Sequence, residues 1–235
     1  MHAQLSPEVL GTFALFEGLT PTQLTWLHSR LHYRSLRAGT YVISREMPAE
    51  AIYLILEGTV KVAIPQSDGG ETILEIVGPG KVVGEMGLVD NNERSADVLT
   101  LEKSALLILD RPTFDQCVNT IPPFVLNLLR VLNARLRRAN EQIQALMTLD
   151  VSGRVARQLL AYADEYGEPV GDGTLIPIRL TQTDIAQLVG ASRERVNQIV
   201  RRLRRKGLIG TGPGRRIILH DRNALAEQAR LHVSQ

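Results

Sequence analysis

The 235-residue sequence contains one cysteine, Cys117. A single cysteine cannot build a disulfide framework, a four-cysteine zinc site or a cysteine-ligated iron–sulfur cluster. The five histidines are dispersed along the chain and form no close ligand pair, so a haem or zinc site is not expected either. We therefore expect a protein that holds no metal.

Hydrophobic runs long enough to cross a membrane are also missing. Every uninterrupted apolar run is far shorter than the ~20 residues that a membrane-spanning helix needs. The N-terminal stretch, MHAQLSPEVLGTFALFEGL, lacks the basic and then apolar pattern of a secretory signal. These absences predict a soluble, cytoplasmic protein without a membrane partner.

The net charge is small and unevenly placed. It sums to +2, but residues from Asp150 onward hold 14 Lys and Arg against 9 Asp and Glu, or +5, and the rest holds 13 against 16, or −3. Only the C-terminal part is therefore expected to bind a polyanion. The length and the 44% hydrophobic content suit one large domain or two small ones.

The spacing of apolar residues separates a helical start from a strand-rich segment. Residues 6–35 are predicted to form short helices. From about Leu36 a two-residue period predicts short strands, and a helix should begin at Arg111-Pro112-Thr113. Strands at intervals of about 8–12 residues, separated by glycine-containing turns, favour an antiparallel jelly roll.

Residues 125–147 carry the most regular hydrophobic repeat. Apolar residues follow one another by alternating steps of four and three, at Val125, Leu129, Leu132, Leu136, Ala139, Ile143 and Leu146. A period of about 3.5 residues is that of a two-stranded coiled coil, so we predict a dimerisation helix, with a hinge at residues 148–150. About three heptads is close to the minimum for this assignment, and one edge of a core helix is the alternative.

Residues 84–96 are suited to holding a phosphate. Gly84 permits close approach of the backbone, and a helical turn beginning at Glu85 would direct N–H groups outward. Arg94 would add a charge-assisted hydrogen bond and Ser95 a hydroxyl donor. Because a carboxylate repels phosphate, Glu85 is better explained as an acceptor for a sugar hydroxyl. Phosphate and sugar together predict a cyclic nucleotide, and the alternative is a structural Glu85–Arg94 ion pair that binds nothing.

Residues 181–206 have the layout of a helix-turn-helix. Residues 181–184 resemble a capping box, residues 189–191 form a tight turn, and Ser192 can cap a second helix. Between Arg193 and Lys206, six Arg and one Lys stand against a single Glu, a density that suits the phosphates of double-stranded DNA. Residues 210–220 would add a two-stranded wing with Arg215 near its turn.

The second helix of this unit would lie in the major groove. Arg193 and Glu194, in its first turn, can read guanine and cytosine, whereas later arginines suit phosphates. The candidate DNA-contacting residues are Thr181, Gln182, Ser192, Arg193, Glu194, Arg195, Gln198, Arg201, Arg202 and Arg215.

The order G-E-x-x-L and then R-S-A, with the long helix, the LDVSGRVA segment and the C-terminal helix pair, is similar to the cyclic-AMP receptor protein (CRP/FNR) family of bacterial transcription regulators. The resemblance implies that Glu85 holds the ribose, and that Arg94 and Ser95 hold the cyclic phosphate with the backbone of Gly84. It also implies that polar residues of the dimer helix hold the adenine. Many members have Thr-Ser where this chain has Ala139 followed by Asn140, so Asn140 is the expected contact and base selectivity stays open.

The resemblance further implies RNA polymerase as a partner and a half-site read by Arg193 and Glu194. A family arginine is replaced here by Gln198, which suits adenine better than guanine, so one position of the half-site should differ.

These observations predict an α+β fold in three parts: a cyclic-nucleotide-binding jelly roll (1–122), a dimerisation helix with hinge (123–149) and a winged helix-turn-helix (150–235). The predicted function is a homodimeric regulator that cyclic AMP controls allosterically and that reads a palindromic DNA site. An effector-independent regulator of the same kind is the main alternative. An enzyme of nucleotide metabolism lacks a metal-ligand constellation, and a scaffold without DNA contact leaves the basic helix unexplained.

Overall fold

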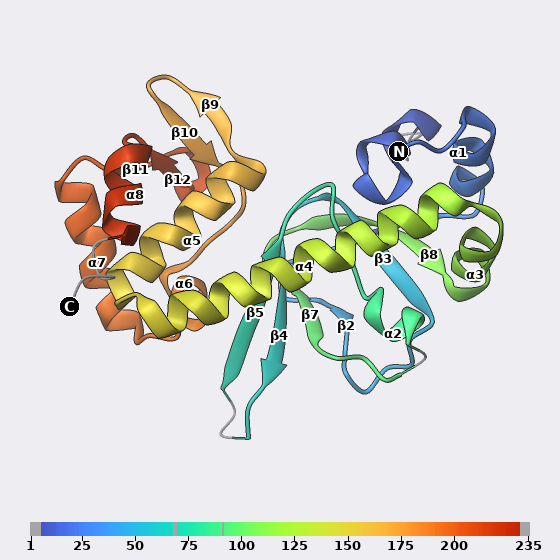
Figure 1. The fold of residues 1–235 in the computed structure, drawn as a ribbon, viewed down its shortest axis with the longest axis horizontal. Coiled ribbons are helices and arrows are strands. Elements are labelled where there is room, and N and C mark those ends of the chain that lie inside the picture. The colour runs from blue at the N-terminus through green and yellow to red at the C-terminus, as the bar shows by residue number, and fades with distance from the viewer. Residues whose placement is uncertain (1–5, 68–69, 91, 231–235) are drawn as a thin grey trace. The chain divides into compact units, whose positions relative to one another are not determined.

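The structure, a computed structural model, describes residues 6–67, 70–90 and 92–230 (Figure 1). The chain forms two compact units, one from residues 1–67 and 74–137 and the other from residues 68–73 and 138–235. Helix α4 (Pro122–Thr148) contributes residues to both units. Within the described ranges, no helix is both long enough and apolar enough to span a membrane.

The first unit begins with the short helices η1 (Pro7–Thr12), η2 (Ala14–Phe16) and α1 (Pro21–His28). Thr20 and Gln23 form a capping box that starts α1, and Pro21 occupies the first helical position, where its missing N–H is not needed. Leu27 is fully buried and packs in one core with phenylalanines of η2, α3 and α4.

Two antiparallel four-stranded sheets, in the orders β1-β8-β3-β6 and β2-β7-β4-β5, form the body of this unit and confirm the predicted β-rich fold (Figure 1). The strands are β1 (His32–Leu36), β2 (Tyr41–Ile43), β3 (Ala51–Glu57), β4 (Val60–Pro65), β5 (Glu71–Val77), β6 (Val82–Val83), β7 (Asp97–Thr100) and β8 (Ser104–Asp110).

Two strands differ from the sequence-based expectation. Residues 32–35 were expected to be helical but belong to β1, and β6 was not expected at all. Only the last residue of β1 is buried, so the strand carries no alternating apolar pattern, and a strand of two residues is too short to show a period. Pairing with β8 and β3, rather than local sequence, makes these segments strands.

Helices α2 (Met86–Val89), α3 (Arg111–Thr120) and the first half of α4 complete the unit. Asp110 caps α3 by accepting from the backbone N–H of Thr113 at 3.0 Å. Phe124 and Leu128 of α4 are buried in the core, and the Asn127 amide donates to the carbonyls of Leu15 (3.2 Å) and Glu17 (2.7 Å). One face of α4 is therefore a core face in this half of the helix.

The second unit contains α5 (Val151–Tyr166), the helix pair α6 (Gln182–Val189) and α7 (Arg193–Arg205), and α8 (Arg222–Arg230). Asp150 caps α5 by accepting from the backbone N–H of Gly153. The predicted two-stranded wing is part of a larger sheet, β11-β12-β10-β9, because a hairpin after α5 pairs with it. Its strands are β9 (Glu168–Val170), β10 (Gly173–Ile176), β11 (Ile209–Thr211) and β12 (Ile217–Leu219).

Candidate functional site

The turn that leads into α2 requires glycine at position 84. Gly84 has φ +88°, and a Cβ there would lie 2.7 Å from Ile43 Cδ1 and 2.8 Å from Arg94 Nη1. Any other residue would be strained in its backbone and would collide with these atoms. Glu85 follows as the N-cap of α2, so the helical turn forms where the sequence predicted it.

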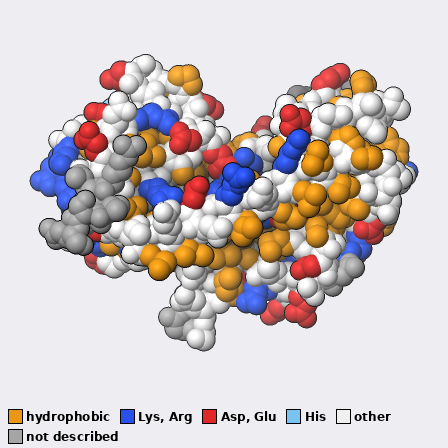
Figure 2. Space-filling view, viewed as in Figure 1, with side chains coloured by type: hydrophobic (Ala, Val, Ile, Leu, Met, Phe, Trp, Pro, Cys, Tyr) orange, Lys and Arg blue, Asp and Glu red, His pale blue; other side chains and the backbone are white. Residues whose placement is uncertain are grey.

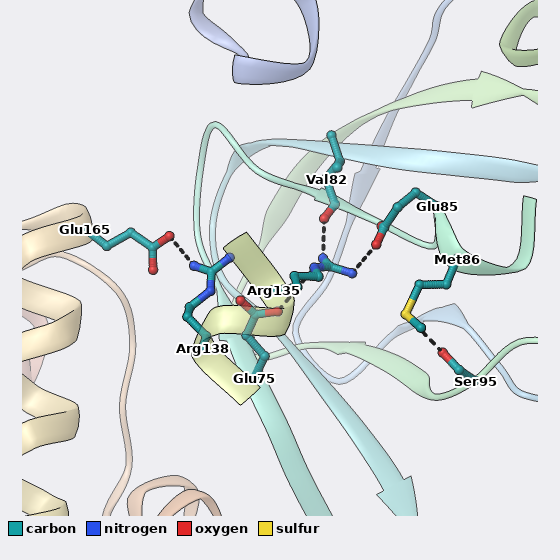
Figure 3. Close-up of polar contacts among 8 residues, drawn as sticks. All are labelled: Glu75, Val82, Glu85, Met86, Ser95, Arg135, Arg138 and Glu165. Carbon is teal, nitrogen blue, oxygen red and sulfur yellow. Dashed lines mark hydrogen bonds and ion pairs between the residues drawn. The ribbon is translucent and has the colours of Figure 1, made fainter. Parts of the chain in front are cut away.

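Glu85 is completely buried, and its partner is Arg135 of α4 (Figure 3). Arg135 Nη1 donates to Glu85 Oε1, Nη2 donates to the carbonyl of Val82 at 2.7 Å, and Nε lies 3.6 Å from a carboxylate oxygen of Glu75. Burial raises the pKa of Glu85, and the charge of Arg135 opposes that shift. Glu85 Oε2 is buried without a hydrogen-bond partner in the described part of the chain.

Arg94 is also buried and is held by backbone carbonyls. Its Nη1 donates to Gly84 at 2.7 Å and its Nη2 to Ala51 at 2.9 Å, whereas Nε is buried and has no partner among the described residues. Burial lowers the pKa of Arg94. The alternative of a Glu85–Arg94 ion pair is therefore wrong, because Glu85 pairs with an arginine of the long helix instead.

A second arginine supports the same turn. Arg111, the first residue of α3, donates to the carbonyl of Ala49 through Nε (3.1 Å) and Nη2 (2.7 Å). Arg94 and Arg111 together tie residues 49–51 to the neighbourhood of the 84–87 turn, since Arg111 Nη2 also lies 3.5 Å from the Gly87 carbonyl. Neither arginine-to-carbonyl contact could be predicted from spacing.

Ser95 is exposed, and its hydroxyl lies 3.9 Å from the sulfur of Met86 (Figure 3). The structure thus brings Gly84, Glu85 and Arg94 together, with Ser95 next to Arg94 in the chain. Asn140 is exposed on α4, within the second unit. Among the described residues no group of His, Cys, Asp and Glu is arranged to hold a metal ion.

The helix-turn-helix has the local geometry that the sequence predicted. Thr181 and Asp184 form a reciprocal capping box, Gly190 ends α6 with φ +61°, and the Ser192 hydroxyl accepts from the N–H of Arg195 at 3.2 Å. One side of α7 faces the core, and its four residues there are buried: Val196, Ile199, Val200 and Leu203.

The opposite side of α7 is exposed and basic. The exposed candidate DNA-contacting residues there are Ser192, Arg193, Glu194, Arg195, Gln198, Arg201 and Arg202. Arg202 also donates to the hydroxyl of Ser152 on α5, so this arginine is already engaged within the protein. Thr181 is exposed and Gln182 is half-buried at the start of α6. Arg215 is exposed in the wing turn with φ +61°, a backbone conformation unusual for arginine.

The hydrophobic repeat of α4 lies mostly on the surface of the single chain. Leu129, Leu136, Ile143 and Leu146 are 57%, 61%, 56% and 47% exposed, and Ala139 is exposed as well. Leu132 differs, because it is partly buried against the core of the first unit. Figure 2 shows hydrophobic side chains gathered along the visible face of α4. Helix α4 therefore has a core face in its first half, and most residues of the predicted seam are exposed outside it.

Comparison with known proteins gives the family. Residues 33–120 match the cyclic nucleotide-binding domain and residues 153–228 match the Crp-like helix-turn-helix domain. The CRP-like cAMP-activated global transcriptional regulator of Mycobacterium tuberculosis (strain CDC 1551 / Oshkosh) is 34% identical over 223 residues, which cover 95% of this chain and 99% of that protein. The chain belongs to the CRP/FNR family of transcription regulators.

Solved structures agree with this membership in the CRP/FNR family. The c-di-GMP responsive regulator CLP of Xanthomonas campestris is 26% identical, with a TM-score of 0.66 over 82% of this chain and 95% of that one. FixK2 of Bradyrhizobium japonicum, 21% identical, shares the fold with a TM-score of 0.74 over 84% and 96% of the two chains. This CRP/FNR protein is thus a DNA-binding transcription regulator with a nucleotide-binding domain.

Proposed function

We propose that this regulator is a homodimer whose affinity for a palindromic DNA site is controlled by cyclic AMP. The proposed sensor is residues 1–122, the dimerisation helix with its hinge is 123–149, and the DNA reader is 150–235. One observation carries the effector part: Glu85 Oε2 and Arg94 Nε are both buried beside Gly84 without a partner in the described chain. Buried polar groups without partners are costly, so a pair of them favours a ligand that supplies both bonds.

The chemistry of the two atoms fits a cyclic nucleotide. Glu85 Oε2 can accept from a ribose hydroxyl, and Arg94 Nε can donate to a phosphate oxygen, with the Ser95 hydroxyl as a second donor. The carbonyl of Gly84 holds Arg94 in place, and Asn140 supplies a donor and an acceptor for a base edge. Cyclic AMP is preferred because the Mycobacterium tuberculosis relative is described as cAMP-activated, whereas CLP, less similar in sequence, is described as c-di-GMP responsive.

Isothermal titration with cyclic AMP and with c-di-GMP tests the effector. The wild-type protein should bind cyclic AMP, and Arg94→Leu should abolish measurable binding because it removes the buried donor. Arg45→Leu, an exposed arginine outside the cassette, is the matched control and should bind like the wild type. Binding of c-di-GMP alone would reassign the effector, and no binding of either would favour the effector-independent alternative.

The dimer part of the proposal rests on the exposed apolar residues of α4. Leucine and isoleucine side chains about half exposed at a seven-residue spacing, Leu129, Leu136 and Ile143, are typical of a coiled-coil seam without its partner helix. Leu136→Glu should convert the dimer to a monomer in analytical ultracentrifugation. Met147→Glu, on the same helix and 82% exposed but outside the repeat, should leave the dimer intact. A wild-type monomer at micromolar concentration would contradict the proposal.

Two recognition helices on one dimer would lie about 34 Å apart and match successive major grooves. A mobility shift on a palindromic site with a guanine in each half-site, with and without cyclic AMP, tests this directly. Tighter binding with cyclic AMP supports allosteric control, and equal binding contradicts it. RNA polymerase is the further partner that this function requires, in the cytoplasm where the DNA lies.

A further inference from the structure

The carbonyl groups at the end of α6 are satisfied by side chains from other helices. A helix leaves its last four carbonyls without intrahelical partners. The Gly190 N–H donates to the carbonyl of Ala186, within the helix. The Leu188 carbonyl instead accepts from Gln142 Nε2 at 3.1 Å, and the Val189 carbonyl accepts from Arg154 Nε at 2.8 Å. Helix α6 is therefore capped by α4 and α5.

The two capping side chains lie on opposite sides of the hinge. Gln142 is on α4, before the hinge, and Arg154 is on α5, after it. Arg154 also donates through Nη1 to the carbonyl of Leu149, within the hinge, at 2.9 Å. An ion pair between Arg138 of α4 and Glu165 of α5 adds a further tie (Figure 3). The end of α6 is thus fixed to the last turns of α4 as well as to α5.

The carbonyl that Gln142 holds is two residues before the glycine of the helix-turn-helix. The Ala191 N–H bonds to the Ala186 carbonyl at 3.0 Å, which closes the turn, and buried residues of α6 and α7 pack against each other on either side of it. A Cβ at Gly190 would lie 3.5 Å from Leu146 Cδ2, so α4 also supports the turn from behind. A displacement of the Leu188 carbonyl relative to α4 would therefore be transmitted to α7.

We propose that Gln142 is a positioning residue for DNA recognition: it fixes the angle between the recognition helix α7 and the long helix α4. The inference rests on the proposed dimer in one respect, since two α4 helices paired as one rod then set the distance between the two recognition helices. Gln142 holds each α7 at the angle that matches one half-site spacing. Without its hydrogen bond, the protein loses affinity for that spacing and tolerates others.

The test compares two isosteric substitutions on the same helix. Gln142→Glu keeps the size of the side chain but replaces the N–H donor with an acceptor that the Leu188 carbonyl cannot bond. Gln144→Glu adds the same charge two residues away at an exposed position. A palindromic site is selected from random DNA with the wild-type protein, and affinities are measured on it and on versions with one base pair added to or removed from the spacer.

Loss of one directed hydrogen bond predicts about fivefold to tenfold weaker binding of Gln142→Glu to the selected spacing. Loss of the same hydrogen bond should lower the ratio of affinities between the selected and altered spacers by about threefold or more. Gln144→Glu should behave like the wild type in both respects. A change in spacing preference separates a positioning role from mere stabilisation, because a loss of stability lowers all affinities together.

The inference is overturned if Gln142→Glu keeps the wild-type spacing preference, even if its melting temperature falls. It is equally overturned if Gln144→Glu shows the same losses, because charge alone would then explain them. A wild-type protein without any spacing preference overturns the proposed dimeric function instead. Hydrogen exchange of the Gly190 and Ala191 amides then decides the inference by itself: faster exchange in Gln142→Glu than in Gln144→Glu supports it, and equal exchange overturns it.

Discussion

Arg135 of the long helix forms an ion pair with Glu85 of the cassette turn, a carboxylate with no exposed surface. The same guanidinium group donates to the carbonyl of Val82, in the strand β6 directly before the turn. A single side chain therefore joins the carboxylate that we assign to the nucleotide sugar to the helix that we assign to the dimer. Any ligand that displaces Glu85 must also change the environment of Arg135, which gives the sensor a physical connection to α4.

Removing Arg135 should destabilise the sensor unit strongly. Arg135→Leu leaves the buried Glu85 charge uncompensated, and breaking a buried pair in this way costs about 3–5 kcal/mol. The melting temperature should fall by roughly 10 °C, measured by differential scanning calorimetry. Arg137→Leu, an exposed arginine two residues along the same helix, is the control and should melt like the wild type. Equal losses in both variants would contradict the assignment of Arg135.

Adding Glu85→Gln to Arg135→Leu should recover most of that loss, since the double variant no longer contains an uncompensated carboxylate. An additive result, with no recovery, would show that the two side chains do not act on each other.

In the ligand-free protein, Glu85 should contribute to the stability of the folded state at low pH. Burial raises the pKa of Glu85 above its ordinary value of 4.5, so the folded state favours the protonated form. This contribution is complete below the unfolded pKa and is lost as the pH rises through the folded pKa. Glu85→Gln should therefore melt higher than the wild type at pH 7, and the difference should shrink toward pH 4.5. A constant difference across this range would mean that the carboxyl group is not the cause.

The parts of the site that lie close together in the chain were predictable from the sequence, and the parts that meet only in the fold were not. Gly84, Glu85 and Arg94 fall within one short stretch whose turn chemistry is local. Arg135 lies 50 residues from Glu85 in the chain. Its helix contains several other arginines nearby, so nothing in the sequence shows which of them pairs with Glu85. The same limit applies to Gln142, whose partner is a backbone carbonyl.

The fold shows a similar division. The caps of α6 and α7 depend on residues three positions apart, so they were predicted correctly from sequence. Strand β1 depends on pairing with β8, more than 60 residues later, and was predicted as helix. Helix α4 was predicted to have one apolar face because its 3.5-residue repeat dominates the pattern. Its second face, with Phe124 and Leu128, is a core face because it packs against residues that are distant in the sequence.

Ser95 should matter for the ligand and not for the fold. Its side chain is exposed and its nearest polar contact is a weak one, to the sulfur of Met86 at 3.9 Å. Ser95→Ala should leave the melting temperature within about 2 °C of the wild type, because surface substitutions of this kind change stability by less than about 0.5 kcal/mol. Cyclic AMP affinity, measured by titration calorimetry, should fall about tenfold through loss of one hydrogen bond to a charged phosphate. Unchanged affinity would remove Ser95 from the site.

The basic face of α7 should separate into residues that read sequence and residues that neutralise phosphate. Arg193 is in the first turn of the helix, where side chains reach base edges, so Arg193→Ala should cost about 1–3 kcal/mol and relax the preference for guanine at one position. Arg201 is two turns further along and exposed, so Arg201→Ala should weaken binding to all sequences alike.

Salt dependence distinguishes these roles most directly. Each phosphate contact contributes about −0.9 to the slope of log K against log salt concentration, so Arg201→Ala should reduce the magnitude of that slope by about 1 per protomer. Arg202 donates to Ser152 within the protein, and Arg202→Ala should therefore reduce the slope less than Arg201→Ala while lowering the melting temperature more. Fluorescence anisotropy on one DNA site at several salt concentrations measures this slope for Arg193→Ala, Arg201→Ala and Arg202→Ala. If Arg202→Ala changed the slope as much as Arg201→Ala without any loss of stability, the prediction would be wrong. Arg202 would then contact phosphate as Arg201 does, and its hydrogen bond to Ser152 would not contribute to stability.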